Sequence, residues 1–239
     1  MLSAQNAVRT HLSWRKRAAS AIVRNWLALR YRVLSRRYGR LILEEIDGVP
    51  LVVLPQVFNP VLLRTGAFMA RALAHLPFDG ADGELSVLDM GTGSGVGAIF
   101  AARRGAHVVA VDINPEAVRC ARMNALLNHL EDKIDVRQGD LFAPVAGQQF
   151  RMVLFNPPFH RGTPRDNLDH AWRGQNVFER FAGGLADVLE PGGRALLVLS
   201  SDGDCADLLV GLMTAGFSVE AVAQKDLINE VLTIYIVCR

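Results

Sequence analysis

The sequence predicts a doubly wound α/β protein in which helices cover both faces of a mainly parallel sheet. From residue 85 onward, short apolar runs typical of buried strands alternate with segments of helical periodicity, which is the pattern of a parallel sheet. The last two runs, Phe217–Val222 and Val231–Val237, have no helix between them, so we expect the final strand to be antiparallel. With 239 residues, half of them apolar, the chain can bury one sizeable core.

Seven strands and four helices are expected in this region. Apolar runs bounded by turn residues predict strands, and apolar residues three and four positions apart predict helices. The first five strands are expected at Ser86–Met90, His107–Asp112, Ile134–Arg137, Met152–Asn156 and Arg194–Ser200, and the helices at about Gly95–Arg104, Pro115–Asn128, Val177–Leu189 and Ala206–Ala215. Pro191-Gly192-Gly193 is expected to be a simple turn that leads into the fifth strand.

Three regions are expected along the chain: a basic helical arm over residues 1–40, a hairpin and helix over 41–84, and the main domain over 85–239. In the middle region, the apolar runs Leu41–Ile46 and Pro50–Leu54 flank Asp47-Gly48, a dipeptide typical of hairpin turns. The segment from Pro60 to Leu76 is expected to form a helix that leads into the main domain.

The arm is set apart by its charge. Its forty positions carry ten basic and no acidic residues, whereas the rest of the chain has sixteen basic and twenty-four acidic side chains. Such a split favours contact with nucleic acid or another anionic surface. Ile22, Trp26, Leu29 and Val33 recur at helical spacing among the arginines and predict an amphipathic helix that ends near Gly39. The alternative is a helix that packs on the main domain by this apolar stripe.

Cysteine usage and hydropathy bear on location. Cys120, Cys205 and Cys238 are far apart and odd in number, so we expect neither a disulfide framework nor a metal site, as in a reducing cytoplasm. No apolar run reaches the roughly 18 residues of a membrane span, so none is expected. The Arg-rich, acid-free arm also has the composition of an organelle transit peptide, which is the second possibility.

The first strand of the main domain runs into a glycine-rich turn, Asp89-Met90-Gly91-Thr92-Gly93-Ser94-Gly95. Glycines there let the backbone approach a ligand and adopt angles that other residues avoid. The second strand ends at Asp112, where a carboxylate can accept both ribose hydroxyls of a nucleoside cofactor. Together these features predict a Rossmann-like cofactor site. A turn without a ligand, with Asp112 only capping the next helix, is the alternative.

Two features favour S-adenosylmethionine over a dinucleotide as the cofactor. The order Asp-x-Gly-x-Gly-x-Gly departs from the Gly-x-Gly-x-x-Gly fingerprint for a pyrophosphate. In addition, we expect Asp89 to face the cofactor as an anion, which is tolerable beside a methionyl ammonium and repulsive toward a pyrophosphate.

The fourth strand ends in Asn156-Pro157-Pro158-Phe159. Two prolines fix the backbone and remove two N–H donors, so carbonyl groups can face a substrate. Asn156 offers a side-chain acceptor and Phe159 a flat apolar face. The turn is therefore suited to hold a planar NH2 group with its nitrogen toward a methyl donor, mainly by positioning. We predict Asn156, Pro157 and Phe159 as catalytic, and a Pro-rich turn without a substrate is the alternative.

These motifs resemble class I S-adenosylmethionine methyltransferases of the HemK type, whose known members methylate the glutamine amide of translation release factors. Leu88 to Gly95 is similar to that family's cofactor loop, Gly139-Asp140-Leu141-Phe142 to its adenine-side acidic loop, and Asn156 to Phe159 to its catalytic motif, which usually ends in Tyr. The resemblance covers roughly Val57 to Cys238. His170-Ala171-Trp172-Arg173-Gly174 resembles the short forms from eukaryotes and archaea, whereas the basic arm resembles neither kind of N-terminus.

The resemblance implies which residues form the site. Cofactor contacts are expected at Asp89, Gly91, Thr92, Gly93, Gly95, Asp112, Ile113, Asp140, Leu141 and Asn156. Substrate contacts are expected at Thr65, Pro158, Phe159, His160 and Trp172, although the acids that usually flank this Thr are missing here. A catalytic base at His160 and simple packing of Trp172 are alternatives.

We therefore expect an N-methyltransferase acting on a planar amide or amine of a macromolecule, first of all a glutamine side chain. Asn156-Pro157-Pro158-Phe159-His160-x-Gly162 also resembles the ribosomal RNA guanine-N2 methyltransferases, so an exocyclic amine of RNA or DNA, guanine N2 or adenine N6, is the alternative. A small-molecule methyltransferase and a binding module without activity are two further alternatives. The intact Asp89, Asp112 and Asn156 count against the latter.

Overall fold

The computed structural model describes residues 40–75, 85–166, 168–227 and 230–239. The helix predicted for the basic arm lies outside these ranges. Among the described residues, no helix combines the length and the apolar character that crossing a membrane requires.

A seven-stranded sheet runs through the centre of the molecule in the order β10-β11-β9-β6-β3-β4-β5. Its strands are β3 (Ser86–Met90), β4 (His107–Asp112), β5 (Ile134–Gln138), β6 (Phe150–Phe155), β9 (Leu189–Ser200), β10 (Ser218–Asp226) and β11 (Val231–Cys238). Strands β5, β4, β3, β6 and β9 pair in parallel, whereas β11 is antiparallel to both β9 and β10. The predicted fold class and the antiparallel last strand are confirmed.

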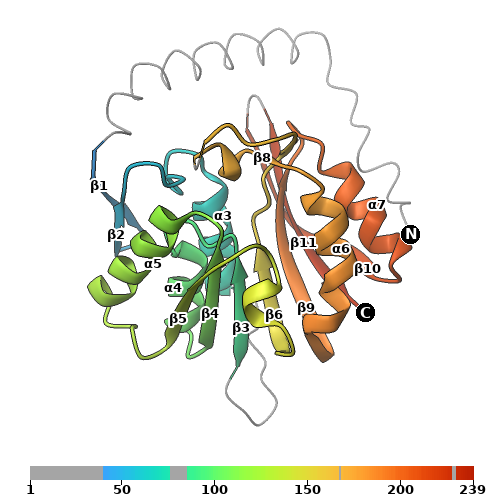
Figure 1. The fold of residues 1–239 in the computed structure, drawn as a ribbon, viewed down its shortest axis with the longest axis horizontal. Helices are drawn as coiled ribbons and strands as arrows, with labels where there is room; N and C mark the ends of the chain where they lie inside the picture. Colours follow the sequence, from blue (N-terminus) through green and yellow to red (C-terminus); the bar gives the residue numbers. More distant parts are fainter. Residues whose placement is uncertain (1–39, 76–84, 167, 228–229) are drawn as a thin grey trace, which may run out of the picture.

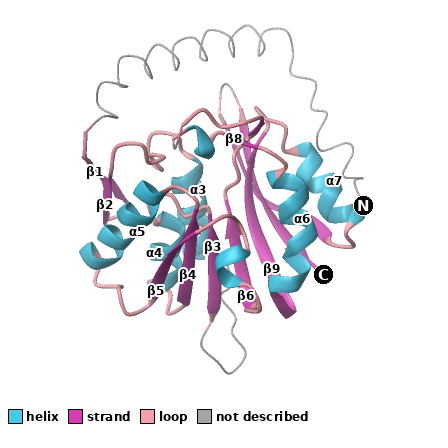
Figure 2. Ribbon diagram, viewed as in Figure 1, coloured by secondary structure: helices cyan, strands magenta, loops and turns pink. Residues whose placement is uncertain are grey.

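Helices cover both faces of the sheet, as Figure 2 shows. They are α3 (Thr65–His75), α4 (Val96–Ala102), α5 (Pro115–Leu127), α6 (Val177–Val188) and α7 (Ala206–Thr214), with short 3-10 turns at Ala143–Val145 and Asp169–Ala171. Successive residues of β3 point to opposite faces: Val87 packs with α3, α4 and α5, and Leu88 packs with α6 and α7. This alternation gives the protein two core layers.

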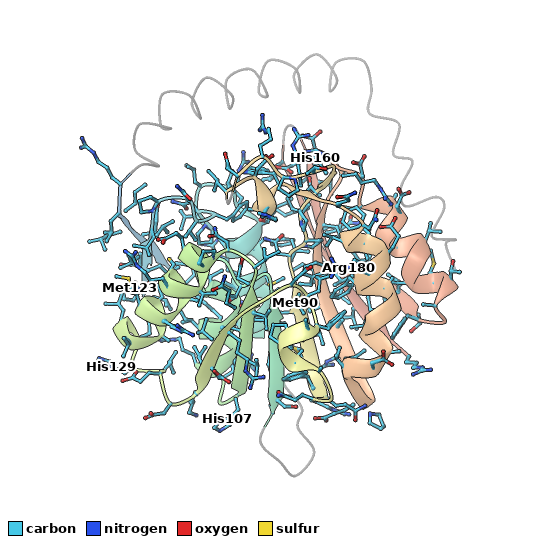
Figure 3. The ribbon with its side chains drawn as sticks, viewed as in Figure 1. Met90, His107, Met123, His129, His160 and Arg180 are labelled. Carbon is cyan, nitrogen blue, oxygen red and sulfur yellow. The ribbon has the colours of Figure 1, made fainter. Side chains whose placement is uncertain are left out.

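The order of the strands places a crevice at one end of the sheet. From β3 the chain continues to β4 and β5 on one side, and it then returns to β6 on the other side of β3. The loops that follow β3 and β6 therefore diverge, and ligands of doubly wound folds bind at such a switch point. In Figure 3, His160 marks this end of the sheet and His107 marks the opposite end.

A separate hairpin precedes the sheet, as predicted. Strands β1 (Ile42–Ile46) and β2 (Val49–Val53) pair in antiparallel register. The turn between them has positive φ at both Asp47 and Gly48, which suits the twist of a two-residue hairpin.

The helix predicted from Pro60 to Leu76 begins later than expected, at Thr65. Asn59 accepts hydrogen bonds from the amides of Val61 and Leu62, and Arg64 has a left-handed φ of 65°. These features form a turn before Thr65, and this turn is incompatible with a helix that begins at Pro60. Leu76 lies outside the described residues.

Strand β9 also differs from the prediction, because it begins at Leu189 and includes Pro191-Gly192-Gly193. The predicted turn is present as an irregularity inside the strand, because Leu189 pairs with Phe150 and Arg194 pairs with Met152, and Gly192 has a left-handed φ of 72°. At Gly193 a Cβ atom would stand 3.1 Å from the Phe150 carbonyl oxygen, so the backbone also approaches β6 closely there. Two further strands, β7 (His160–Arg161) and β8 (Arg173–Gly174), pair in parallel beside the crevice. They were not predicted, since two residues carry no periodicity. Strand β10 extends to Asp226, four residues beyond its predicted end at Val222. The other predicted boundaries are met within two residues.

Candidate functional site

A cleft of about 500 Å³ lies at the carboxyl ends of β3, β4 and β6. Most of the residues predicted to bind a cofactor or a substrate line it, although they come from four separate loops. They are Asp89, Gly91, Thr92, Gly93, Asp112, Ile113, Asp140, Leu141, Asn156, Pro157, Pro158 and Phe159. The sequence motifs thus converge on one site.

One end of the cleft is formed by the glycine turn and Asp112. Gly93 has a φ of 57°, and a Cβ atom added to it would meet nothing within 4 Å, so the backbone faces open space. Its amide donates to Asp112 Oδ2 over 2.8 Å, and the Asn114 amide donates to Oδ1 over 2.9 Å. These bonds hold the carboxylate against the turn, while burial raises its pKa.

Asp89 lies beneath the glycine turn, 4% exposed. Its Oδ2 accepts from the Thr92 hydroxyl over 2.6 Å and from the Ala98 amide over 2.9 Å. Burial raises the pKa of Asp89 to about 6, although both hydrogen bonds favour the ionised form. The carboxylate therefore fixes the conformation of the turn as well as lining the cleft.

Asp140 lines the outer part of the same end. It is half-exposed, and Arg180 of α6 donates to its Oδ2 over 2.9 Å. Figure 3 shows Arg180 on the α6 side of the crevice. The ion pair connects the loop after β5 with α6.

The other end of the cleft is formed by the turn after β6. Asn156 Nδ2 donates to Thr65 Oγ1 over 3.2 Å, across 91 positions of sequence. Asn156 Oδ1 is buried and has no hydrogen-bond partner among the described residues. A buried acceptor without a donor is costly, so it marks the place where a donor group from a ligand belongs.

The loop after β9 contacts the Phe159 backbone. The Phe159 carbonyl oxygen accepts from the Asp204 amide over 2.8 Å, and Gly203 approaches so closely that a Cβ atom there would stand 2.6 Å from that oxygen. The Phe159 ring is 7% exposed and belongs to the core layer with α6 and α7. Only part of it faces the cleft.

Four predicted residues do not line the cleft. Gly95 is the N-terminal cap of α4, Thr65 is 1% exposed and bonded to Asn156, and His160 is exposed in β7. Trp172 packs against Phe58 instead, with ring centroids 5.5 Å apart. Their predicted contacts with cofactor or substrate stay predictions.

Several residues that line the cleft were missed by the sequence analysis, among them Gln56, Phe58, Ser94, Arg173 and Arg180. The Ser94 hydroxyl is buried without a partner among the described residues, and its place inside the glycine turn was an available signal. Arg173 belongs to the His170–Gly174 segment that carries the resemblance to the short forms. Gln56, Phe58 and Arg180 come from segments without a motif, so only the folded chain reveals them.

Comparisons with known proteins agree with this geometry. The family model of the methyltransferase small domain matches residues 56–228. The chain belongs to this methyltransferase family. A Methanocaldococcus jannaschii protein, provisionally named a protein N5-glutamine methyltransferase, is 31% identical over 189 residues, which cover 75% of this chain and 90% of that protein.

Two further relatives show the range of the family. The release factor glutamine methyltransferase of Escherichia coli is 38% identical over 156 residues, 61% of this chain and 52% of that enzyme, so the chain matches about half of its length. A T. thermophilus 16S rRNA guanine-N2 methyltransferase, solved with its cofactor and guanosine, has a TM-score of 0.63 at 24% identity, covering 84% of this chain and 50% of that one. The latter likeness concerns the fold.

S-adenosylmethionine is the cofactor of this methyltransferase, and the cleft fits it. The open space in front of Gly93 accommodates a ligand at the backbone. The Asp112 carboxylate has both oxygens oriented by amides at the end of β4, where a ribose diol is bound in Rossmann-like folds. The cleft continues from there to the unpaired Asn156 Oδ1.

Lowering the pH through about 6 is expected to weaken cofactor binding. Because the pKa of Asp89 is raised to about 6, the free protein takes up a proton there as the pH falls. The predicted contact between this carboxylate and the methionyl ammonium would then lose its charge. Calorimetry with S-adenosylhomocysteine should show the affinity falling by up to about tenfold per pH unit below that point. Asp89→Asn should bind more weakly at neutral pH and show a shallower slope. A constant affinity between about pH 5 and 8 would contradict the contact.

Proposed function

We propose that the protein transfers a methyl group from S-adenosylmethionine to a planar NH2 nitrogen, specifically the side-chain amide of a glutamine in a protein. The observation that carries this proposal is the unpaired Asn156 Oδ1, held in the cleft by the bond from its own Nδ2 to Thr65. An NH2 group is the donor that this acceptor lacks. The names of the M. jannaschii and E. coli relatives support glutamine as the acceptor.

The proposed roles divide along the cleft. Asp112 accepts hydrogen bonds from the ribose hydroxyls, and Asp140 accepts one from the adenine amine. The nucleoside is surrounded by Gly91, Gly93, Ile113 and Leu141. The buried Thr92 stabilises the glycine turn through its bond to Asp89. S-adenosylmethionine supplies an electrophilic methyl group. Asn156 Oδ1 accepts a hydrogen bond from the acceptor NH2 and directs the nitrogen lone pair along the cleft, and the proton leaves to solvent after transfer. Positioning of this kind accounts for much of an in-line transfer.

The remaining predicted residues support the acceptor end in this proposal. Pro157 and Pro158 leave the backbone of the turn without N–H donors, so its carbonyl groups face the acceptor. Thr65 acts as a positioning residue for Asn156. We retain the division into an arm at 1–40, a leading segment at 41–84 and a methyltransferase domain at 85–239, and a cytoplasmic location, as proposals.

An exocyclic amine of RNA is the second candidate, and two observations favour it. The first is the arm, with ten basic and no acidic residues. The second is a pair of exposed arginines on the loop above the cleft: Arg165 and Arg173 share the buried Asp169, with 78% and 44% of their side chains exposed. Exposed guanidinium groups suit phosphate contacts, and Asp166 of the same loop, which accepts from the Asp169 amide, adds a second carboxylate.

A labelling experiment decides between the two candidates. The protein is incubated with S-adenosylmethionine labelled in its methyl group and with cell extract, and aliquots are then digested with nuclease or with protease. Glutamine methylation predicts that protease releases the label and nuclease does not. Release by nuclease alone supports RNA methylation, and the absence of any transferred label overturns both candidates.

Deleting residues 1–40 should leave S-adenosylhomocysteine affinity nearly unchanged and should weaken binding to RNA or ribosomes. Ten basic residues without an acid attract polyanions, and phosphate contacts weaken steeply with salt. Fluorescence anisotropy with labelled RNA at several salt concentrations, together with the melting temperature, checks this. Unchanged RNA binding combined with a lower melting temperature would show that the arm is a structural brace.

A further inference from the structure

Phe58 lines the same cleft as the turn after β6, and it belongs to no sequence motif. The ring is half-buried, and it belongs to none of the three hydrophobic clusters that form the core of the described residues. Within the described part of the chain, its ring contact is with Trp172, which also lies outside those clusters. An aromatic pair that contributes so little to the core needs another explanation.

The backbone around Phe58 is fixed on both sides. Before it, Gln56 has a φ of 63°, and its carbonyl oxygen accepts from Asn114 Nδ2 over 2.8 Å. After it, Asn59 is 1% exposed, donates to Glu44 of the hairpin over 2.8 Å, and accepts from the Val61 and Leu62 amides. Two buried amide side chains therefore hold this short segment in one place, which pre-organises the ring between them.

The Phe58 ring is also held by its contact with Trp172. Trp172 is in turn hydrogen-bonded to the segment that follows the proline turn. Trp172 lies 5.5 Å away, with the two ring planes inclined by 59°. The Trp172 carbonyl oxygen accepts from the amide of His160, the residue that follows Phe159. The aromatic pair thus connects the hairpin side of the cleft to the segment that carries Asn156, Pro157 and Pro158.

The Phe159 ring is largely committed to the core, with 7% of its surface exposed. The sequence analysis assigned the flat face for a planar acceptor to Phe159. Phe58 has a larger exposed fraction than Phe159, and it belongs to none of the hydrophobic clusters of the described residues. The cleft that Phe58 and the proline turn both line also has apolar lining residues such as Pro60 and Met69, and it contains the unpaired acceptor Asn156 Oδ1. That combination suits a flat group that carries an NH2.

We infer that Phe58 contacts the methyl acceptor, stacking on its planar amide or base and selecting planar acceptors, and that Trp172 is the positioning residue that sets the ring of Phe58. This inference rests on the proposed function, because it names the residue that recognises the acceptor. Loss of one stacking face reduces the affinity for the acceptor by about tenfold, at the upper end of measured aromatic contacts, and leaves the cofactor end unaffected.

The test uses equilibrium binding, so that it does not depend on turnover. Guanosine and N-acetylglutamine methylamide serve as planar probes in saturation-transfer NMR on the full chain with saturating S-adenosylhomocysteine, whose own affinity is measured by calorimetry. Phe58→Leu should weaken the better-bound probe by about tenfold and change S-adenosylhomocysteine affinity by less than about twofold, whereas Phe58→Tyr should bind like the wild type. Phe68→Leu is the matched control, because Phe68 is a half-buried aromatic residue of α3 that packs on the core and does not line the cleft.

Trp172 is tested by its coupling to Phe58. Trp172→Leu should weaken probe binding, Trp172→Phe should restore it, and Trp172→Leu should add nothing in the Phe58→Leu background. Three outcomes overturn the inference: unchanged probe binding in Phe58→Leu, equal losses for probe and S-adenosylhomocysteine, or no binding of either probe by the wild type. The proposed function fails separately, through the absence of transferred label in the extract experiment.

Discussion

Asn156→Ala is expected to reduce methyl transfer by at least about a hundredfold, the effect of removing one pre-organised polar group from an active site. Asn156 Oδ1 is the buried acceptor that an NH2 group would satisfy, and alanine leaves nothing to orient the attacking nitrogen. Single-turnover transfer of labelled methyl to the accepting fraction of the extract measures the rate. Asn128→Ala is the matched control, because Asn128 lies at the end of α5 and bonds to the Pro50 carbonyl, away from the cleft. A rate in Asn156→Ala equal to that of Asn128→Ala would exclude this role.

Gly203→Ala is expected to impair methyl transfer, although residue 203 does not line the cleft in which the cofactor and the methyl acceptor are proposed to bind. The added methyl group would stand 2.6 Å from the Phe159 carbonyl oxygen and 2.9 Å from its Cβ. Either the loop after β9 or the turn that carries Asn156 must therefore shift, and we expect the turn to be displaced. A displacement of about 1 Å is enough to cost about a hundredfold in turnover. The strain should also lower the free energy of unfolding by about 1–3 kcal/mol.

The matched control for that substitution is Gly183→Ala in α6. A Cβ atom at Gly183 meets nothing within 4 Å, and alanine is a better helix former than glycine. The free energy of unfolding should therefore rise by roughly 0.5–1 kcal/mol, with transfer unchanged. Transfer rates are measured at a temperature at which urea titration shows that the wild type, Gly203→Ala and Gly183→Ala are all folded. Normal transfer by folded Gly203→Ala would indicate that the position of the turn is not critical.

The sequence predicts the parts of the fold that depend on local pattern. β3 and β4 were predicted to the residue, because each is an apolar run that ends at a turn signal. The start of α3 was missed, because the preceding turn depends on Asn59, whose side chain is held by Glu44 from the hairpin. No local window contains both residues, and tertiary contacts override helix propensity in such a case.

The candidate site divides in the same way. Residues inside motifs, such as Asp112 and Asn156, were found because their chemistry is tied to a fixed place after a strand. The bond between Asn156 and Thr65 joins positions 91 residues apart, and the contact between Phe58 and Trp172 also joins distant segments. Such pairs have no signal in a single sequence, because only folding brings them together.

The claim that the two ends of the cleft act separately is tested most directly by calorimetric titration of S-adenosylhomocysteine into the wild type, Asp112→Ala and Asn156→Ala. Asp112 lies at the end of β4 with both oxygens oriented by amides. Its loss should remove the charge-assisted bonds to the ribose that we propose, and should weaken affinity by about tenfold or more. Asn156→Ala should stay within about threefold of the wild type, since its free oxygen serves the acceptor. Equal affinity of wild type and Asp112→Ala, or a large loss in Asn156→Ala, would contradict this division of the cleft.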